Sequence, residues 1–293
     1  MKPGRGLDHL VLAVRDLDAA AARYQRWGFT LTPRAQHPWG TANRLVQFDG
    51  VFLELVEVDR PALIAEPAPG DVSFGARARD FLQRREGFAM LVFESRDARI
   101  DYAELLAAGL AARPPFDFSR PARLPDGSVV TVGFSLVFLP DPRIPDATIF
   151  LCQQQAPQHF WKPAYQRHAN ATQGVGEVVM SADRPAAWEA HFAALQGEDA
   201  VRNTPEGLDV ATARGRVVVR RSADVAARFG GPITGGRGGT PGLAGFSLET
   251  SRLEAVTEAL AATGTRHRRL DDRVVIPADE AFGCGLEFVQ AAR

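Results

Sequence analysis

One arrangement of residues occurs four times along the 293 residues of this chain. In each copy a short apolar stretch ends at a residue able to cap a helix, an amphipathic stretch follows, and a glycine closes it. The copies begin near Leu7, Phe88, Val175 and Leu243, a spacing too wide for a solenoid of short repeats. The pattern therefore predicts four copies of one supersecondary module. The caps are Asp16, Asp97, Asp183 and Ser251, and the glycines are Gly28, Gly109, Gly197 and Gly264.

The residues within each copy favour one helix followed by strands. The side-chain oxygen of each cap residue can accept from the free backbone N–H groups of the first helical turn. Apolar residues then recur every three or four positions, as Leu17, Ala21 and Tyr24 do in the first copy. Runs rich in Val, Leu, Ile and Phe follow each helix, separated by turn dipeptides. Each module is predicted as strand–helix–strand–strand–strand, with one sheet face against the helix and the other lining a concavity.

Chain length and an irregular central segment predict two domains. Domains commonly contain about 100–200 residues, so a chain of 293 residues favours two of them. The stretch from Gln153 to Gln173 breaks all periodicity and separates the second module from the third. We expect an α+β protein in which four modules pair into two domains. Their predicted bounds are 1–155 and 174–293, with a linker at 156–173.

Composition excludes several functional classes. Hydrophobic residues make up 45% of the chain and charged residues 24%, which supports a folded core. The net charge of −1 gives no general attraction to nucleic acid or to an anionic membrane, and no apolar run is long enough to span a bilayer. Cys152 and Cys284 stand in apolar strand patterns, which indicates buried thiols in a reducing cytoplasm. We expect a cytoplasmic protein that binds a small molecule. The sequence does not decide whether the C-terminal half also forms the surface of a homodimer.

Three stretches of the first module carry a family resemblance. They are LDHLVLAVRDLDAA from Leu7, His37 followed by GTANR (Gly40 to Arg44), and FLELV (Phe52 to Val56). Together with the four modules, they resemble the vicinal oxygen chelate superfamily, and the first module resembles its glyoxalase-like domain branch. Members include glyoxalases, extradiol dioxygenases, epimerases, thiol transferases and drug-sequestering proteins. The resemblance therefore implies the fold strongly and the reaction weakly.

The resemblance also implies a divalent metal inside each paired sheet, held by the first and last strands of a module. The matching residues of the first module are His9 and Glu54. Imidazole and carboxylate are ordinary ligands of zinc, iron, manganese or nickel. Side chains alternate along a strand, so His9 is expected on the same face as Leu7 and Val11. Glu54 is expected on the same face as Phe52 and Val56. A buried histidine and a glutamate that pair with each other are the alternative.

The second module departs from this ligand pattern. The position matching His9 is about Met90, and the strand matching FLELV offers Phe150, Leu151 or Cys152. No hard metal ligand stands there, unless Cys152 or a neighbouring glutamine serves.

The third and fourth modules offer only Glu177 and Glu287 at matching positions. No half of the chain shows a complete ligand set. We expect both glutamates to be structural and the main cavity to lie in the N-terminal half.

Candidate ligand-binding residues lie in two loops. His37, Asn43 and Arg44 belong to a loop that enters a strand, where function often concentrates, although turn chemistry also explains such residues. Trp161 and His168 belong to the aromatic segment between the halves, where they could cover a cavity mouth or pack both halves together. In the second module, Arg120 or Arg123 could meet a substrate carboxylate bidentately.

Two main hypotheses about function follow. In the first, a divalent metal on His9 and Glu54 binds two vicinal oxygens of a small substrate, and Glu54 moves a proton in lyase or isomerase chemistry. In the second, the same cavity sequesters a small molecule without metal. An extradiol-type dioxygenase is a third, weaker hypothesis, because it needs two histidines and a carboxylate and only His9 and Glu54 are in register.

Overall fold

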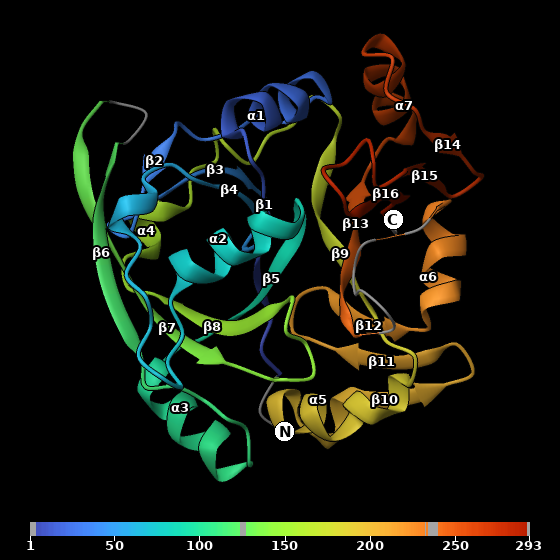
Figure 1. The fold of residues 1–293 in the computed structure, drawn as a ribbon. Helices are drawn as coiled ribbons and strands as arrows, with labels where there is room; N and C mark the ends of the chain where they lie inside the picture. The colour runs from blue at the N-terminus through green and yellow to red at the C-terminus, as the bar shows by residue number, and fades with distance from the viewer. Residues whose placement is uncertain (1–3, 124–126, 232, 234–239, 292–293) are drawn as a thin grey trace.

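Two eight-stranded sheets form the protein, one from each half of the chain (Figure 1). The computed structural model describes residues 4–123, 127–231, 233 and 240–291. The first sheet has the strand order β2-β3-β4-β1-β5-β8-β7-β6, and the second has the order β10-β11-β12-β9-β13-β16-β15-β14. The strands of the first sheet are β1 (Leu7–Ala13), β2 (Ala35–Gln36), β3 (Thr41–Gln47), β4 (Phe52–Val58), β5 (Gly87–Glu94), β6 (Phe116–Arg123), β7 (Val129–Leu139) and β8 (Thr148–Gln154). Those of the second are β9 (Thr172–Ser181), β10 (Val201–Thr204), β11 (Gly207–Ala211), β12 (Arg216–Arg220), β13 (Gly242–Thr250), β14 (Arg268–Arg269), β15 (Arg273–Ile276) and β16 (Gly285–Gln290).

Each sheet combines two modules in the same way. The last strand of a module runs parallel to its first strand, as β4 does to β1 and β8 to β5. The first strands of the paired modules meet antiparallel, β1 with β5 and β9 with β13. The second half repeats this arrangement, with β12 parallel to β9 and β16 parallel to β13. The four predicted modules and the α+β class are confirmed. The module helices are α1 (Leu17–Arg26), α3 (Ala98–Ala107), α5 (Glu189–Gln196) and α7 (Leu253–Ala262).

The predicted helix caps are correct in the first half and wrong in the second. The carboxylates of Asp16 and Asp97 accept from backbone N–H groups of the first turns of α1 and α3. Asp183 instead accepts from a serine hydroxyl at the start of another helix, because Pro185 opens a 3₁₀ turn (Pro185–Trp188) ahead of α5. Ser251 lies two residues before Leu253, the first residue of α7, and the cap position is Arg252, which makes no side-chain cap hydrogen bond.

One continuous apolar core joins the two halves. It contains buried residues of all four module helices and of one face of each sheet. At its centre Phe88 of β5 lies against Phe246 of β13, with ring centroids 5.9 Å apart. The indole N–H of Trp27 donates across the halves to the hydroxyl of Thr265. The other face of each sheet is left for a separate, smaller cluster.

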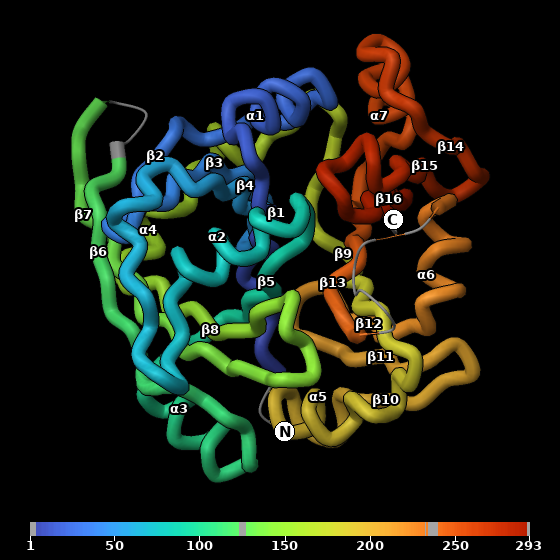
Figure 2. The backbone as a smooth tube through the Cα atoms, in the orientation of Figure 1, coloured from blue at the N-terminus to red at the C-terminus, as the bar shows by residue number. Residues whose placement is uncertain are grey.

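Each half contains one further helix between its two modules, and this helix packs on the remaining face of the sheet. Helix α2 (Phe74–Arg84) packs Phe74, Ala78 and Phe81 into the apolar cluster of the first sheet. Helix α6 (Ser222–Phe229) packs Val225 and Phe229 into the corresponding cluster of the second sheet. Figures 1 and 2 show each helix within the curve of its own sheet. The concave face of each half is therefore partly filled by its own chain.

The segment between the halves contains the short helix α4 (Pro157–Phe160) and returns to the first sheet before β9 begins. Cys152 and Cys284 are free and buried, as predicted. None of the helices in the described residues is long and apolar enough to cross a bilayer.

Candidate metal and ligand site

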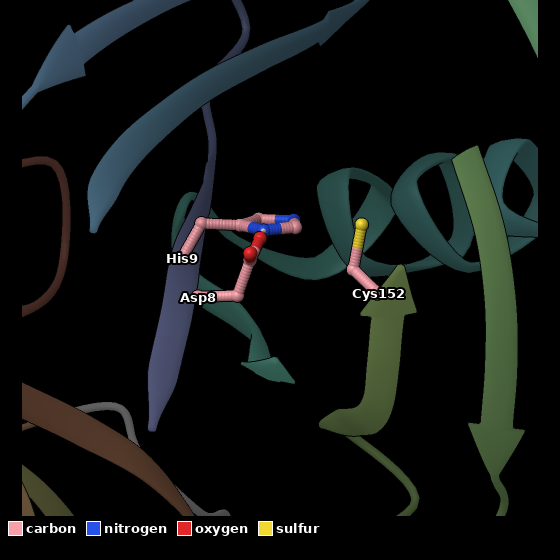
Figure 3. A group of neighbouring side chains, drawn as sticks. All are labelled: Asp8, His9 and Cys152. Atoms are coloured by element: carbon pink, nitrogen blue, oxygen red, sulfur yellow. Dashed lines mark hydrogen bonds and ion pairs between the residues drawn. The ribbon is translucent and has the colours of Figure 1, made fainter. Parts of the chain in front are cut away.

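Strand β1 contains a bulge that turns two neighbouring side chains toward the concave face. Its pairing with β5 passes from Leu7 opposite Phe93 directly to His9 opposite Val92, so Asp8 has no partner residue. A bulge of this kind breaks the strict alternation of side chains along a strand. Leu7 consequently packs in the core between the halves, whereas Asp8 and His9 point the same way (Figure 3). The predicted common face of Leu7 and His9 is therefore wrong.

Asp8 fixes the orientation and the tautomer of His9. The Oδ1 atom of Asp8 lies 2.5 Å from Nδ1 of His9, and because a carboxylate only accepts, Nδ1 carries the hydrogen. Gln154 donates to the other oxygen of Asp8 at 2.9 Å. The ring of Phe52 stacks on the imidazole, with centroids 4.4 Å apart. The lone pair of Nε2 is left facing the cavity, where Oε2 of Glu54 lies 3.7 Å away.

His37 and Asn43 join Glu54 on the same wall. The amide nitrogen of Asn43 donates to Oε1 of Glu54 at 2.6 Å. Nε2 of His37 lies 3.6 Å from the same oxygen, and its Nδ1 is 2.8 Å from the hydroxyl of Thr41. Trp39 stacks on the His37 ring at 4.8 Å between centroids. The structure thus brings together four of the residues predicted for a site: His9, His37, Asn43 and Glu54.

The facing wall comes from the second module and is mostly apolar. Phe150 of β8 and Leu136 of β7 line it, and Met90 of β5 is buried in the same cluster, so the strand positions that match His9 and Glu54 carry no hard ligand. Cys152 of β8 places a softer donor, its sulfur, on this wall. Its sulfur and the ligand atoms of Asp8 and His9 all lie within 4.8 Å of one another (Figure 3).

Burial determines the charge of two of these groups. It lowers the pKa of His37 to about 3, with a further lowering from the positive charge of Arg120, so this imidazole is neutral near pH 7. Burial also raises the pKa of the Cys152 thiol, and the carboxylates of Asp8 and Glu54 raise it further, so Cys152 is a neutral thiol. The site therefore offers a neutral His37 imidazole and a neutral Cys152 thiol beside two carboxylates.

Arg120 brings a cation to the rim of the site. It lies on β6, is 9% exposed, and its pKa is lowered by burial, an effect that Glu54 opposes. Its Nε has no hydrogen-bond partner. Arg120 was one of two arginines expected to meet a carboxylate. The side chain of the other, Arg123, lies outside the described residues.

The site opens from a small cavity into a larger groove. The inner cavity has a volume of about 40 Å³ and is lined by His9, His37 and Glu54 among others. The outer groove has a volume of about 340 Å³ and reaches Arg34, Lys162 and Tyr165. The two volumes share four lining residues: Asn43, Leu45, Arg120 and Phe160.

A family model described as a glyoxalase-like domain matches residues 7–196 of the chain. The chain belongs to the glyoxalase-like domain family. The match covers the first two modules and the start of the third, and it contains each residue of the site described above. A search of curated proteins found no significant match.

Solved structures share the fold of this glyoxalase-like protein at low sequence identity. A hypothetical protein from Staphylococcus aureus aligns at a TM-score of 0.67 and 12% identity, over 98% of this chain and all of that one. A mutant 4-hydroxymandelate synthase from Streptomyces coelicolor aligns at 0.52 and 12%, over 99% and 94% of the two chains. A xylose isomerase-like TIM barrel/4-hydroxyphenylpyruvate dioxygenase fusion protein aligns at 0.52 and 14%, over 99% of this chain and 50% of that one. These similarities show the fold alone.

Three predicted ligand-binding residues of the glyoxalase-like protein do not line the cavity or the groove. Arg44 alternates with Asn43 along β3, so it faces the helix side and donates to Asp18 of α1. Trp161 packs beside the site without lining it. His168 uses both ring nitrogens on backbone groups: Nδ1 accepts from an N–H group and Nε2 donates to the carbonyl of Gln47. These contacts explain His168 and Arg44 as structural residues.

The corresponding position in the second half is closed. Arg228 of α6 donates to both Glu177 and Glu287, which are the two carboxylates available there. The ring of Phe229 lies against Gly285, where a side chain would collide with it. The expected structural role of the two glutamates agrees with these ion pairs.

Proposed function

We propose that this glyoxalase-like protein is a metal-dependent enzyme that acts on a small oxygenated organic molecule in the inner cavity. The pairing of His9 and Glu54 supports this most strongly. The free lone pair of His9 faces a carboxylate oxygen at 3.7 Å, while Asp8 holds the other ring nitrogen. Two ligands of one zinc or iron ion lie roughly 3–3.5 Å apart, so a small movement suffices. A carboxylate behind a metal-binding histidine is the usual supporting contact.

The donor set fits a divalent ion, with His37 as the third ligand. Its neutral Nε2 lies 3.6 Å from Glu54, on the oxygen opposite the one that faces His9. Histidine and carboxylate together suit zinc, iron, manganese or nickel. Asp8, His9 and Cys152 form a second arrangement that shares His9, and Cys152→Ser distinguishes the two because only the second loses a ligand.

The residues of the cavity then have distinct roles. An ion held there would supply Lewis-acid polarisation of two neighbouring substrate oxygens. Glu54 accepts a proton from the carbon beside the polarised carbonyl, and Asn43 holds that carboxylate in place through its amide nitrogen. Asp8 orients His9, and the apolar wall around Phe150 keeps water out. This is proton-transfer chemistry of the lyase or isomerase class.

A dioxygenase is the second candidate, because His9, His37 and Glu54 make up two histidines and one carboxylate. This combination is the ligand set of non-haem iron oxygenases. Sequence spacing alone did not bring His37 into register, whereas the loop before β3 does so in space. A metal-free binding protein remains the alternative that the apolar facing wall supports.

To test this proposal, the untagged protein is loaded with zinc, manganese, nickel or iron(II), one metal at a time, in D₂O. A panel of small 2-oxo and 2-hydroxy carbonyl compounds is followed by NMR for hydrogen exchange, with an oxygen electrode in parallel. We expect metal-dependent exchange that Glu54→Gln abolishes. Iron-dependent oxygen consumption would support the dioxygenase, and binding without either chemistry would support sequestration.

A further inference from the structure

Arg120 is a buried charged residue that the proposed metal site does not use. It is nine-tenths buried and is attracted by the Glu54 carboxylate, but no carboxylate among the described residues forms an ion pair or hydrogen bond with its guanidinium. Its Nε has no acceptor. A buried guanidinium without a partner is costly, so such residues usually have one. By contrast, Arg34 on the rim of the same groove is paired with both Glu57 and Asp59.

The position of Arg120 connects the two volumes of the site. It lines both the inner cavity and the outer groove, and it lies on β6, the edge strand at the opposite end of the sheet from β2. A group bound to it would therefore lie between the proposed metal and the groove. The shared lining also includes Leu45 and Phe160, which give an apolar passage between them.

The charges of the site favour one additional negative charge. The formal charges at the site are those of the Asp8 and Glu54 carboxylates and of the Arg120 guanidinium, two negative and one positive. A divalent ion would convert this net negative charge into a single positive one. A monoanion neutralises that charge, whereas a phosphate dianion would exceed it. The planar fork of arginine also matches a carboxylate bidentately.

We propose that Arg120 is the anchor for the carboxylate of a small organic monoanion, whose remaining part extends into the outer groove. This inference rests on the proposed function for the metal, but the contact with Arg120 does not require the ion. The substrate class is a monocarboxylate that bears a neighbouring oxygen function.

Two probes of nearly equal shape test this inference. Oxamate carries one carboxylate, and oxamide replaces it with a neutral amide. Calorimetry on the metal-loaded protein should show oxamate binding roughly ten- to a hundredfold more tightly than oxamide. Arg120→Gln should remove this preference, and Arg120→Lys should keep part of it. Arg202→Gln, at an exposed arginine of β10 in the second half, should leave it unchanged. Equal binding of the two probes, tighter binding of inorganic phosphate, or no binding of oxamate at millimolar concentration would overturn the proposal.

Two further measurements separate this proposal from the metal proposal. In metal-free protein, oxamate should bind more weakly, and Arg120→Gln should still reduce its affinity; the Arg120 contact then stands even if no ion binds. Without any ligand, Arg120→Met should raise the Tm by about 2 °C or more, because the cost of burying this charge exceeds its attraction to Glu54. A drop in the Tm together with an unchanged oxamate preference would mean that Arg120 is structural.

Discussion

At the scale of single residues, the site depends on a hydrogen bond that orients one imidazole. Asp8 accepts a hydrogen bond from Nδ1–H of His9, which leaves the Nε2 lone pair directed toward Glu54. Supporting carboxylates of this kind raise the basicity of the ligand and hold its ring in place. The contact is buried, so water cannot replace it readily.

Asp8→Asn should therefore weaken the binding of zinc or manganese by roughly ten- to a hundredfold. The amide keeps the shape of the side chain but no longer fixes the tautomer of His9. Isothermal titration with each metal measures the change. Asp199→Asn, on an exposed surface, is the control and should have no effect. An unchanged affinity in Asp8→Asn would show that Asp8 does not support a ligand.

The sequence predicts His9, Glu54, His37 and Asn43 as site residues, and the structure places all four around one cavity. Asp8 escapes prediction because alternation assigns it to the opposite face, and only the bulge in β1 reverses this. A bulge depends on pairing with β5, which is distant in sequence, so local patterns do not reveal it.

At the scale of secondary-structure elements, the helices between modules decide which concave face stays open. Helix α6 presses Phe229 against the centre of the second sheet, beside Gly285. Helix α2 covers only part of the first sheet and leaves the inner cavity beside His37. The repeated pattern does not predict either helix, because both lie outside the repeated unit. The apolar spacing of Phe74, Ala78 and Phe81 was a usable signal for α2.

Phe229→Ala should destabilise the protein by about 3–5 kcal/mol, because it removes a fully buried ring and leaves a cavity over Gly285. Urea unfolding followed by circular dichroism measures the free energy. Phe116→Ala replaces a ring that is 44% exposed and should cost far less. Similar losses in the two variants would mean that α6 does not fill the second sheet.

At the scale of the whole molecule, the two halves pack through a contact whose contribution to the free energy of unfolding depends on pH. His191 of α5 lies beside Asp141 and Arg143, which belong to the connection between β7 and β8 of the first half. Burial lowers the pKa of His191 to about 4; Asp141 opposes this shift and Arg143 adds to it. Because the unfolded chain takes up this proton near pH 6.5, stability is full above that pH and is lost as the pH falls toward 4.

His191→Gln should remove this part of the pH dependence. Between pH 7 and pH 5 the wild-type protein should lose about 2 kcal/mol more unfolding free energy than the variant. Urea unfolding at both pH values gives the comparison, and His267→Gln is the control for a histidine outside the contact. Parallel losses in wild type and His191→Gln would contradict the assignment.

The family resemblance of the first module correctly predicts the fold of the whole chain. Each module has an apolar sheet face, and pairing the modules buries these faces in one core. It does not imply which half keeps an open site. That difference arises from Arg228 and Phe229, which close the second half. Their role depends on where α6 packs, and its sequence alone does not specify that position.

The central claim, that the first half holds one divalent ion on His9 and Glu54, is tested most directly by metal stoichiometry. The untagged protein is dialysed against zinc or manganese and its bound metal is counted by mass spectrometry, with folding checked by circular dichroism. We predict one ion per chain in the wild type, loss of the ion in His9→Ala with Glu54→Gln, and full retention in Glu177→Gln with Glu287→Gln. No bound ion in the wild type, or loss confined to the second pair of substitutions, would contradict the account.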